Sequence, residues 1–296
     1  MSKFALCCGI NDYPGTVNDL NGCVNDCNAM KSLFLSKGFS VTTLLNSACT
    51  KNGFISILKE IIAGAVAGDI IAISYSGHGT HVADKNGDEI DGYDEALYLY
   101  DNVLIDDEIR EVLDTIDLDI TVLIFLDSCF SGTSTRKISD VAEYSKIKYV
   151  TTDVVDITKA VTKLVKDNIR ENEIFFSACA DDEYSYDAYI NGSYNGAFTY
   201  YLIKSFLDGA SYESWFEALR KYLPSTGYPQ TPQLEGDEDV ILGGALLGSG
   251  IVSDVEEETQ FITNSESDSS DSTNYTKWII LSVLVVIILI LVLIVG

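Results

Sequence analysis

The sequence predicts an α/β fold built around a mainly parallel β-sheet. Two apolar runs of strand length, residues 70–76 and 122–126, each lead into polar or glycine-rich residues. Strand-like and helix-like segments also alternate along the first half of the chain, a pattern typical of parallel sheets covered by helices. The length of 296 residues and the hydrophobic content of 47% allow a sizeable core. We therefore expect one large α/β domain over residues 1–248.

The individual elements follow from apolar spacing and from turn residues. Apolar runs predict strands at residues 4–10, 40–45, 70–76, 96–100, 122–126 and 174–178. Helical spacing predicts helices at residues 22–37, 50–65, 106–113, 156–169, 196–207 and 212–223. Gly38 suits the end of the first helix and Thr50 the N-cap of the second. Asn86-Gly87 predicts a hairpin turn.

Composition excludes several classes of function. The net charge of −26 disfavours nucleic-acid binding, because phosphate recognition needs clustered Lys and Arg. The seven cysteines are scattered and form no C-x-x-C pair, and both histidines lie near residue 80, so neither a disulfide framework nor a zinc site is indicated. The apolar run at 4–8 is too short for a signal peptide. We expect a reducing, cytosolic setting for the folded domain.

The C-terminal part differs in composition from the rest. Residues 249–277 are rich in Ser, Thr, Asp and Glu, which is typical of a disordered linker. Residues 278–296 are almost wholly apolar and span roughly 28 Å as a helix, enough to cross a hydrocarbon layer of about 30 Å. A buried core helix is the alternative. We expect a transmembrane tail anchor in a lipid bilayer, with the folded domain in the cytosol and the thin endoplasmic reticulum membrane slightly favoured.

Reactive side chains follow two of the predicted strands. His78 comes after the 70–76 run and Cys129 after the 122–126 run. Because parallel strands end at the same edge of a sheet, the imidazole and the thiol should emerge together, as a Cys-His dyad requires. Backbone N–H groups near Gly79 and Cys129 are candidates for an oxyanion hole. The alternative is an inert buried thiol and an unrelated loop histidine.

The sequence motifs around His78 and Cys129 resemble those of a known family. Tyr75-Ser76-Gly77-His78-Gly79-Thr80 and Asp127-Ser128-Cys129-Phe130-Ser131-Gly132 resemble the two catalytic motifs of metacaspases, the caspase-like cysteine peptidases. The resemblance covers roughly residues 3 to 247. It implies a caspase-like three-layer sandwich, with a large-subunit-like part at about 1–135 and a small-subunit-like part at about 173–248.

The resemblance also implies an activity. In metacaspases the dyad cleaves peptide bonds after Arg or Lys, so His78 would be the general base and Cys129 the nucleophile. The residues that match the pocket for the basic side chain are Cys23, Asp26, Ser76 and Asp127. Two carboxylates there suit a guanidinium or ammonium group. Calcium is the expected cofactor, with Asp94, Asp106 and Asp107 matching its ligands.

Activation by self-cleavage is a further expectation. Basic residues in the segment after the active site are the candidates, namely Arg136, Lys137, Lys146 and Lys148. We expect a monomeric catalytic domain acting on protein or peptide substrates. The rival readings are a catalytically silent membrane adaptor, a caspase-like peptidase with another pocket preference, and a protein whose main role is calcium binding.

Overall fold

A six-stranded sheet forms the centre of the molecule. The computed structural model describes residues 1–83, 93–129, 145–151, 169–180, 183–243 and 247. The sheet has the strand order β12-β9-β7-β3-β1-β2, and all neighbours are parallel except β12 and β9. Its strands are β1 (Lys3–Gly9), β2 (Ser40–Leu45), β3 (Ile70–Ser76), β7 (Thr121–Asp127), β9 (Glu173–Ser177) and β12 (Gln233–Gly236).

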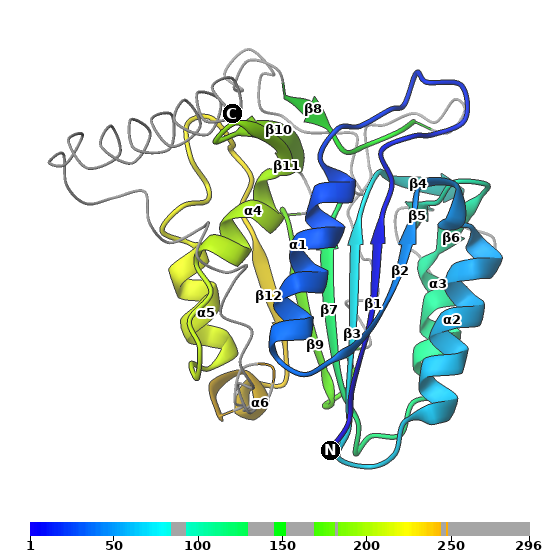
Figure 1. The fold of residues 1–296 in the computed structure, drawn as a ribbon, viewed down its shortest axis with the longest axis vertical. Helices are drawn as coiled ribbons and strands as arrows, with labels where there is room; N and C mark the ends of the chain where they lie inside the picture. The colour runs from blue at the N-terminus through cyan, green and yellow to red at the C-terminus, as the bar shows by residue number, and fades with distance from the viewer. Residues whose placement is uncertain (84–92, 130–144, 152–168, 181–182, 244–246, 248–296) are drawn as a thin grey trace, which may run out of the picture. The chain divides into compact units, whose positions relative to one another are not determined.

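Helices cover both faces of this sheet. On one face pack α1 (Cys23–Ser36), α4 (Ala197–Lys204) and α5 (Tyr212–Leu219), which lie in front of the strands in Figure 1. On the other face pack α2 (Lys51–Gly64) and α3 (Asp106–Leu113). Side chains of β3 and β7 alternate between the two cores, so both strands are buried on both faces. This burial explains why they read as continuous apolar runs.

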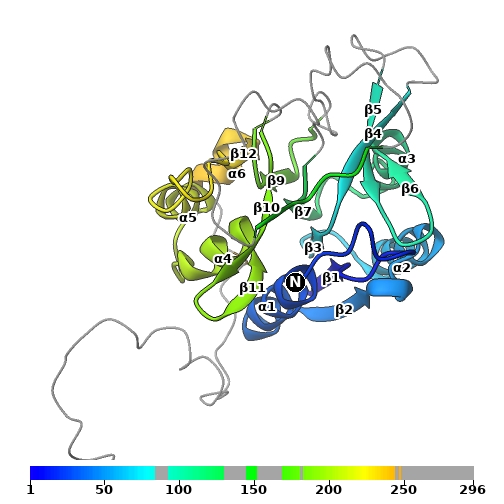
Figure 2. The same ribbon diagram turned by 90° about the horizontal axis from the view of Figure 1, so that it is seen from above.

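Two small sheets flank the central one. The first joins β4 (Gly79–Ala83), β5 (Tyr93–Tyr98) and β6 (Val103–Ile105), and the second joins β8 (Lys146–Ile147), β10 (Tyr186–Ile190) and β11 (Ser193–Gly196). Short helices complete the described part, η1 (Asn46–Ala48) and α6 (Glu238–Gly243). Seen from above, β4 and β5 rise on one side of the central strands and β10 and β11 lie on the other (Figure 2).

Most predicted elements are confirmed. The strand at 70–76 has its predicted bounds, and Thr50 caps α2 by accepting a hydrogen bond from the Gly53 N–H. Gly38 follows α1 with a positive φ of 79°. The helices predicted at 196–207 and 212–223 end earlier, at Lys204 and Leu219, because the chain continues there as hydrogen-bonded turns. The strands β6, β8, β10, β11 and β12 were not predicted.

Several predictions fall outside the described residues. They are the turn at 86–87, most of the helix at 156–169, the linker at 249–277 and the apolar segment at 278–296. The chain divides into two compact units, Met1–Ser253 and Asp254–Gly296, and the second consists wholly of such residues. Among the described residues, no helix has the length and apolar character needed to cross a bilayer.

Candidate active site

The predicted dyad lies at one edge of the central sheet. Ser76 at the end of β3 pairs with Asp127 at the end of β7, and His78 and Cys129 each follow two residues later. The register of two neighbouring parallel strands therefore brings the imidazole and the thiol to the same edge, as the sequence predicted. Both side chains are buried.

The His78 imidazole is set up as a neutral base. Its Nε2 lies 2.7 Å from the carbonyl oxygen of Asn18, an acceptor only, so Nε2 carries the proton and Nδ1 keeps its lone pair. Nδ1 has no hydrogen-bond partner among the described residues. Burial lowers the pKa of His78 to about 4, partly opposed by the hydrogen bond to Asn18. The Tyr13 hydroxyl accepts the backbone N–H of His78, and the two rings lie 4.9 Å apart.

A peptide carbonyl lies between two backbone donors beside Cys129. The N–H groups of Gly79 and Cys129 donate to the carbonyl oxygen of Lys148 over 3.0 and 3.2 Å. These are the two groups expected to form an oxyanion hole. The Cys129 sulfur meanwhile accepts the N–H of Ser185 at 2.6 Å. The carbonyl of Lys148 thus occupies the two donors that the sequence predicts as an oxyanion hole.

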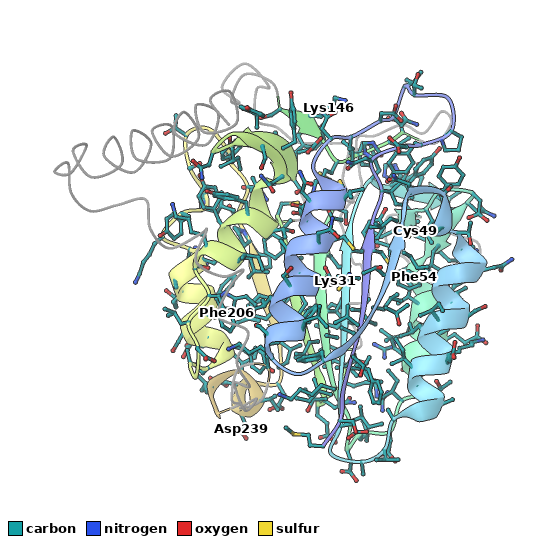
Figure 3. The ribbon with its side chains drawn as sticks, viewed as in Figure 1. Lys31, Cys49, Phe54, Lys146, Phe206 and Asp239 are labelled. Carbon is teal, nitrogen blue, oxygen red and sulfur yellow. The ribbon has the colours of Figure 1, made fainter. Side chains whose placement is uncertain are left out.

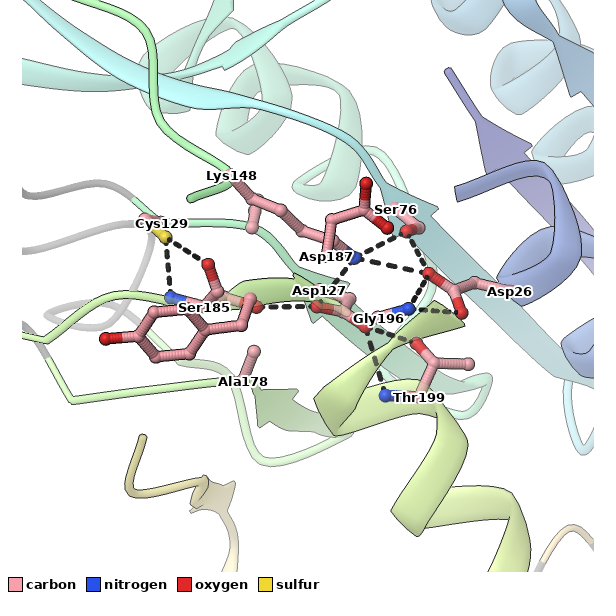
Figure 4. A network of polar contacts seen from close by, with 12 residues as sticks. Asp26, Ser76, Asp127, Cys129, Lys148, Ala178, Ser185, Asp187, Gly196 and Thr199 are labelled. Carbon is pink, nitrogen blue, oxygen red and sulfur yellow. Dashed lines mark hydrogen bonds and ion pairs between the residues drawn. The ribbon is translucent and has the colours of Figure 1, made fainter. Parts of the chain in front are cut away.

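The side chain of Lys148 enters an acidic pocket (Figure 4). Its Nζ lies 2.9 Å from Asp127 Oδ1 and 3.2 Å from Asp26 Oδ2, and it donates to Ser76 Oγ at 2.9 Å. The lysine is fully buried, at 0% exposure. Burial acts to lower the pKa of Lys148, but the nearby negative charges, Asp127 first among them, raise it well above the usual lysine value. Lys148 is therefore a charged, fully desolvated cation.

Neighbouring groups hold the two carboxylates in place. The backbone N–H of Gly196 donates to both oxygens of Asp26, and Ser76 Oγ donates to Asp26 Oδ2 at 2.6 Å. Thr199 donates to Asp127 from both its N–H and its hydroxyl. Burial raises the pKa of Asp26 to about 6, while the charge of Lys148 acts to lower it. The pocket is a fixed set of acceptors for one cation.

Some residues of this pocket carried no usable signal in the sequence. Asp187 is buried beside the pocket, and its charge also raises the pKa of Lys148. Gly196 is required by space, because a Cβ there would clash with Asp127, Asp26 and Lys148 Nζ. Cys23, predicted to line the pocket, is buried near Lys148 and Asp26, whose charges act on its thiol. Asp187 and Gly196 can be assigned to this pocket only from the structure, because the pairing of β10 with β11 brings them there.

The chain on either side of Lys148 binds as an added strand. Before it, β8 pairs antiparallel with β10, and the Lys148 N–H donates to the carbonyl of Ser185 at 3.0 Å. After it, Tyr149 forms a parallel bridge with Gly79, and the Val150 N–H donates to the Gly79 carbonyl at 3.1 Å. Main-chain pairing of this kind is how extended peptides dock on sheet edges.

The other self-cleavage candidates differ from Lys148. The side chain of Lys146 is exposed and its Nζ donates to the carbonyl of Asp19. Figure 3 shows Lys146 at the end of the molecule opposite Asp239. Arg136 and Lys137 lie outside the described residues. Of the four candidates, only Lys148 is seen in the pocket within the described part of the chain.

The predicted calcium ligands lie on two elements of the fold. Asp94 lies in β5, and Asp106 and Asp107 begin α3. Among the described residues, no group of three or more His, Cys, Asp or Glu side chains is positioned to hold a metal ion. Calcium binding by these residues therefore stays a prediction.

Comparison with known proteins agrees with this geometry. The model of the caspase domain family matches residues 2–238. The chain belongs to the caspase family. The resemblance to metacaspases is confirmed as well, because the curated relatives include Metacaspase-2 of Arabidopsis thaliana, 30% identical over 71% of this chain. Metacaspase-3 of the same plant is 32% identical over 69% of the chain, and Metacaspase-1 of Scheffersomyces stipitis 29% over 62%.

A solved structure is also similar to this chain. A protein from Geobacter sulfurreducens is 27% identical, with a TM-score of 0.63, and the alignment covers 79% of this chain and 93% of that one. The chain spans between 52% and 59% of the length of the three curated metacaspases. The two motifs around His78 and Cys129 and the buried Lys148 therefore lie within the part of the chain that matches the caspase domain.

Proposed function

We propose that this protein is a cysteine endopeptidase that cuts after Lys or Arg and that first cuts its own chain between Lys148 and Tyr149. The observation that carries the proposal is the position of Lys148, with its ammonium group between two carboxylates and its carbonyl between two N–H donors. A buried lysine is costly unless its charge is matched, so the pocket is specific for a cation. Asp26 and Asp127 disfavour an acidic residue at the same position.

The proposed reaction begins with proton transfer from the Cys129 thiol to Nδ1 of His78. The sulfur attacks the Lys148 carbonyl carbon, and the resulting oxyanion is held by the N–H groups of Gly79 and Cys129. The carbon–nitrogen bond to Tyr149 then breaks, and His78 gives its proton to the departing nitrogen. Water, deprotonated by His78, hydrolyses the thioester and restores the thiol.

The backbone of Asn18 has a defined part in this scheme. Its carbonyl fixes the His78 tautomer, so that Nδ1 rather than Nε2 takes the thiol proton. Because His78 is neutral at physiological pH, it can act as base without prior deprotonation. The arrangement supports acyl transfer more than it supports a silent adaptor, which needs neither an oriented imidazole nor paired N–H donors.

The test uses the full chain, the Cys129→Ala variant and the His78→Ala variant. The wild type should yield a fragment that begins at Tyr149, seen by N-terminal sequencing, and should cleave peptides after Lys or Arg but not after Asp. Neither variant should do so. Failure of the folded wild type to cut itself and every peptide would contradict the proposal and favour the adaptor.

The setting of the enzyme is also proposed from the sequence. Residues 278–296 would anchor the chain in a bilayer, with the peptidase domain in the cytosol and the endoplasmic reticulum membrane slightly favoured. Its substrates would be proteins or peptides with Lys or Arg before the cut, and its catalytic domain would act as a monomer. Extraction of membranes with alkaline carbonate tests the anchor, because an integral protein stays in the pellet.

A further inference from the structure

His81 lies against the residue that follows the proposed cut. Tyr149 stacks on the His81 ring, with centroids 5.8 Å apart and planes inclined by 29°. Its hydroxyl lies 2.9 Å from His81 Nδ1. His81 is buried and is also flanked by Tyr93, whose ring meets it edge-on at 5.2 Å. Tyr149 thus contacts His81 in two ways, through the stacking of its ring and through the polar contact of its hydroxyl.

The backbone fixes which substrate position meets His81. Gly79 bridges Tyr149 in parallel, with bonds to Lys148 and Val150 on either side. His81 stands two residues beyond Gly79 on β4, hence on the same face of that strand. Any peptide that puts a basic residue in the pocket and its carbonyl between the Gly79 and Cys129 donors therefore brings its next side chain to His81.

The polar contact distinguishes tyrosine from phenylalanine. Burial raises the pKa of Tyr149 to about 12, so the phenol keeps its proton at neutral pH and can donate to an unprotonated Nδ1. A phenylalanine would keep the stacking but leave this nitrogen without the hydroxyl, and a buried polar atom that loses its partner is costly. An aliphatic residue would lose both contacts.

We propose that His81 determines specificity at the position after the cut and selects an aromatic residue that carries a hydroxyl, so that Lys-Tyr and Arg-Tyr bonds are preferred substrates. This inference rests on the proposed peptidase activity. It assigns to the second histidine of the chain a role in choosing substrates, separate from the proton transfer of His78. Proteins that expose a basic residue followed by tyrosine form the expected substrate class.

The experiment uses the full chain after self-cleavage and quenched fluorescent peptides of the sequence Ala-Ile-Lys-X-Val, which hold a single Lys, with X as Tyr, Phe or Ala. We expect kcat/KM for Tyr to exceed that for Phe by about 3- to 10-fold, and that for Phe to exceed Ala by about tenfold. Equal values for the three cleaved peptides would overturn the inference while leaving the peptidase proposal intact. Cleavage of none of them by folded protein would overturn both.

Two substitutions at His81 separate its ring from its polar atom. His81→Phe should keep the preference for aromatic residues and bring the Tyr-to-Phe ratio to about one, because the hydrogen-bond partner is lost. His81→Asn keeps a polar atom near the Nδ1 position and should retain more of that ratio while losing the preference for Phe over Ala. A Tyr-to-Phe ratio unchanged in folded His81→Phe would overturn the assignment. Should either variant fail to fold, the wild-type peptide series still decides.

Discussion

Lys148→Met is the substitution that probes the pocket most directly. Methionine has nearly the shape of lysine but no charge, so two buried carboxylates would lose the cation that lies 2.9 and 3.2 Å from them. Removing one partner of a buried ion pair costs about 3–5 kcal/mol. At about 1.4 kcal/mol for each factor of ten, the docked fraction and hence the rate of cutting after residue 148 should fall by roughly two to four orders of magnitude.

The assay follows the appearance of the fragment that begins at residue 149 by mass spectrometry. Lys148→Arg keeps the charge and should still be cut, since a guanidinium pairs well with carboxylates. Lys146→Met makes the same chemical change two residues away, on an exposed side chain, and should cut at close to the wild-type rate. Formation of this fragment by Lys148→Met at the wild-type rate would refute the reasoning, because the pocket would then not require a cation.

Three further predictions concern the same pocket and its surroundings. Gly196→Ala should slow self-cleavage about 10- to 100-fold, because the added methyl overpacks the pocket. Gly64→Ala is the matched control, since a Cβ there meets open space. Equal rates of self-cleavage for the two variants, followed on gels, would contradict the clash. Lowering the pH from 7 to 5 should slow self-cleavage about tenfold, because Asp26, with its pKa raised to about 6, loses its charge as the pH falls. His78, with its pKa lowered to about 4, stays neutral over this range. A cleavage rate that does not change between pH 7 and pH 5 would exclude Asp26 as the titrating group. Calcium should accelerate cleavage and a chelator slow it, because Asp94, Asp106 and Asp107 are predicted calcium ligands; identical rates in calcium and in chelator would contradict this prediction.

The central strands were predictable because they are buried on both faces. A strand such as β3, covered by helices on either side, must be apolar at nearly every position, so its run of residues reveals its bounds. The short strands β10, β11 and β12 were missed for the opposite reason. They mix polar and apolar residues, and β11 and β12 contain glycine. The pairing of β12 with β9 and of β10 with β8 also depends on partners far along the chain.

The site was predictable where it follows from strand ends and not where it depends on distant backbone. His78 and Cys129 are each two residues past a paired strand end, so local sequence was sufficient. The Asn18 carbonyl that orients His78 is a main-chain group, which leaves no trace in the residue type. Lys148 could not be told from Lys146 by sequence, because the choice depends on the pairing of β8 with β10.

The buried lysine is better understood as a recognition element than as a source of stability. Desolvation of an ion pair largely offsets the attraction between its charges, so a matched pair adds little net stability, whereas a mismatch is severe. Exchange of Lys148 for the lysine of an incoming substrate would therefore preserve every charged contact with Asp26 and Asp127. The free energy of the exchange would then depend on the flanking contacts, namely the pairing of β8 with β10 and the packing of Tyr149 on His81. The proposed cut after Lys148 would leave these two sets of contacts no longer joined covalently, so that each side could leave separately and free the pocket for another chain.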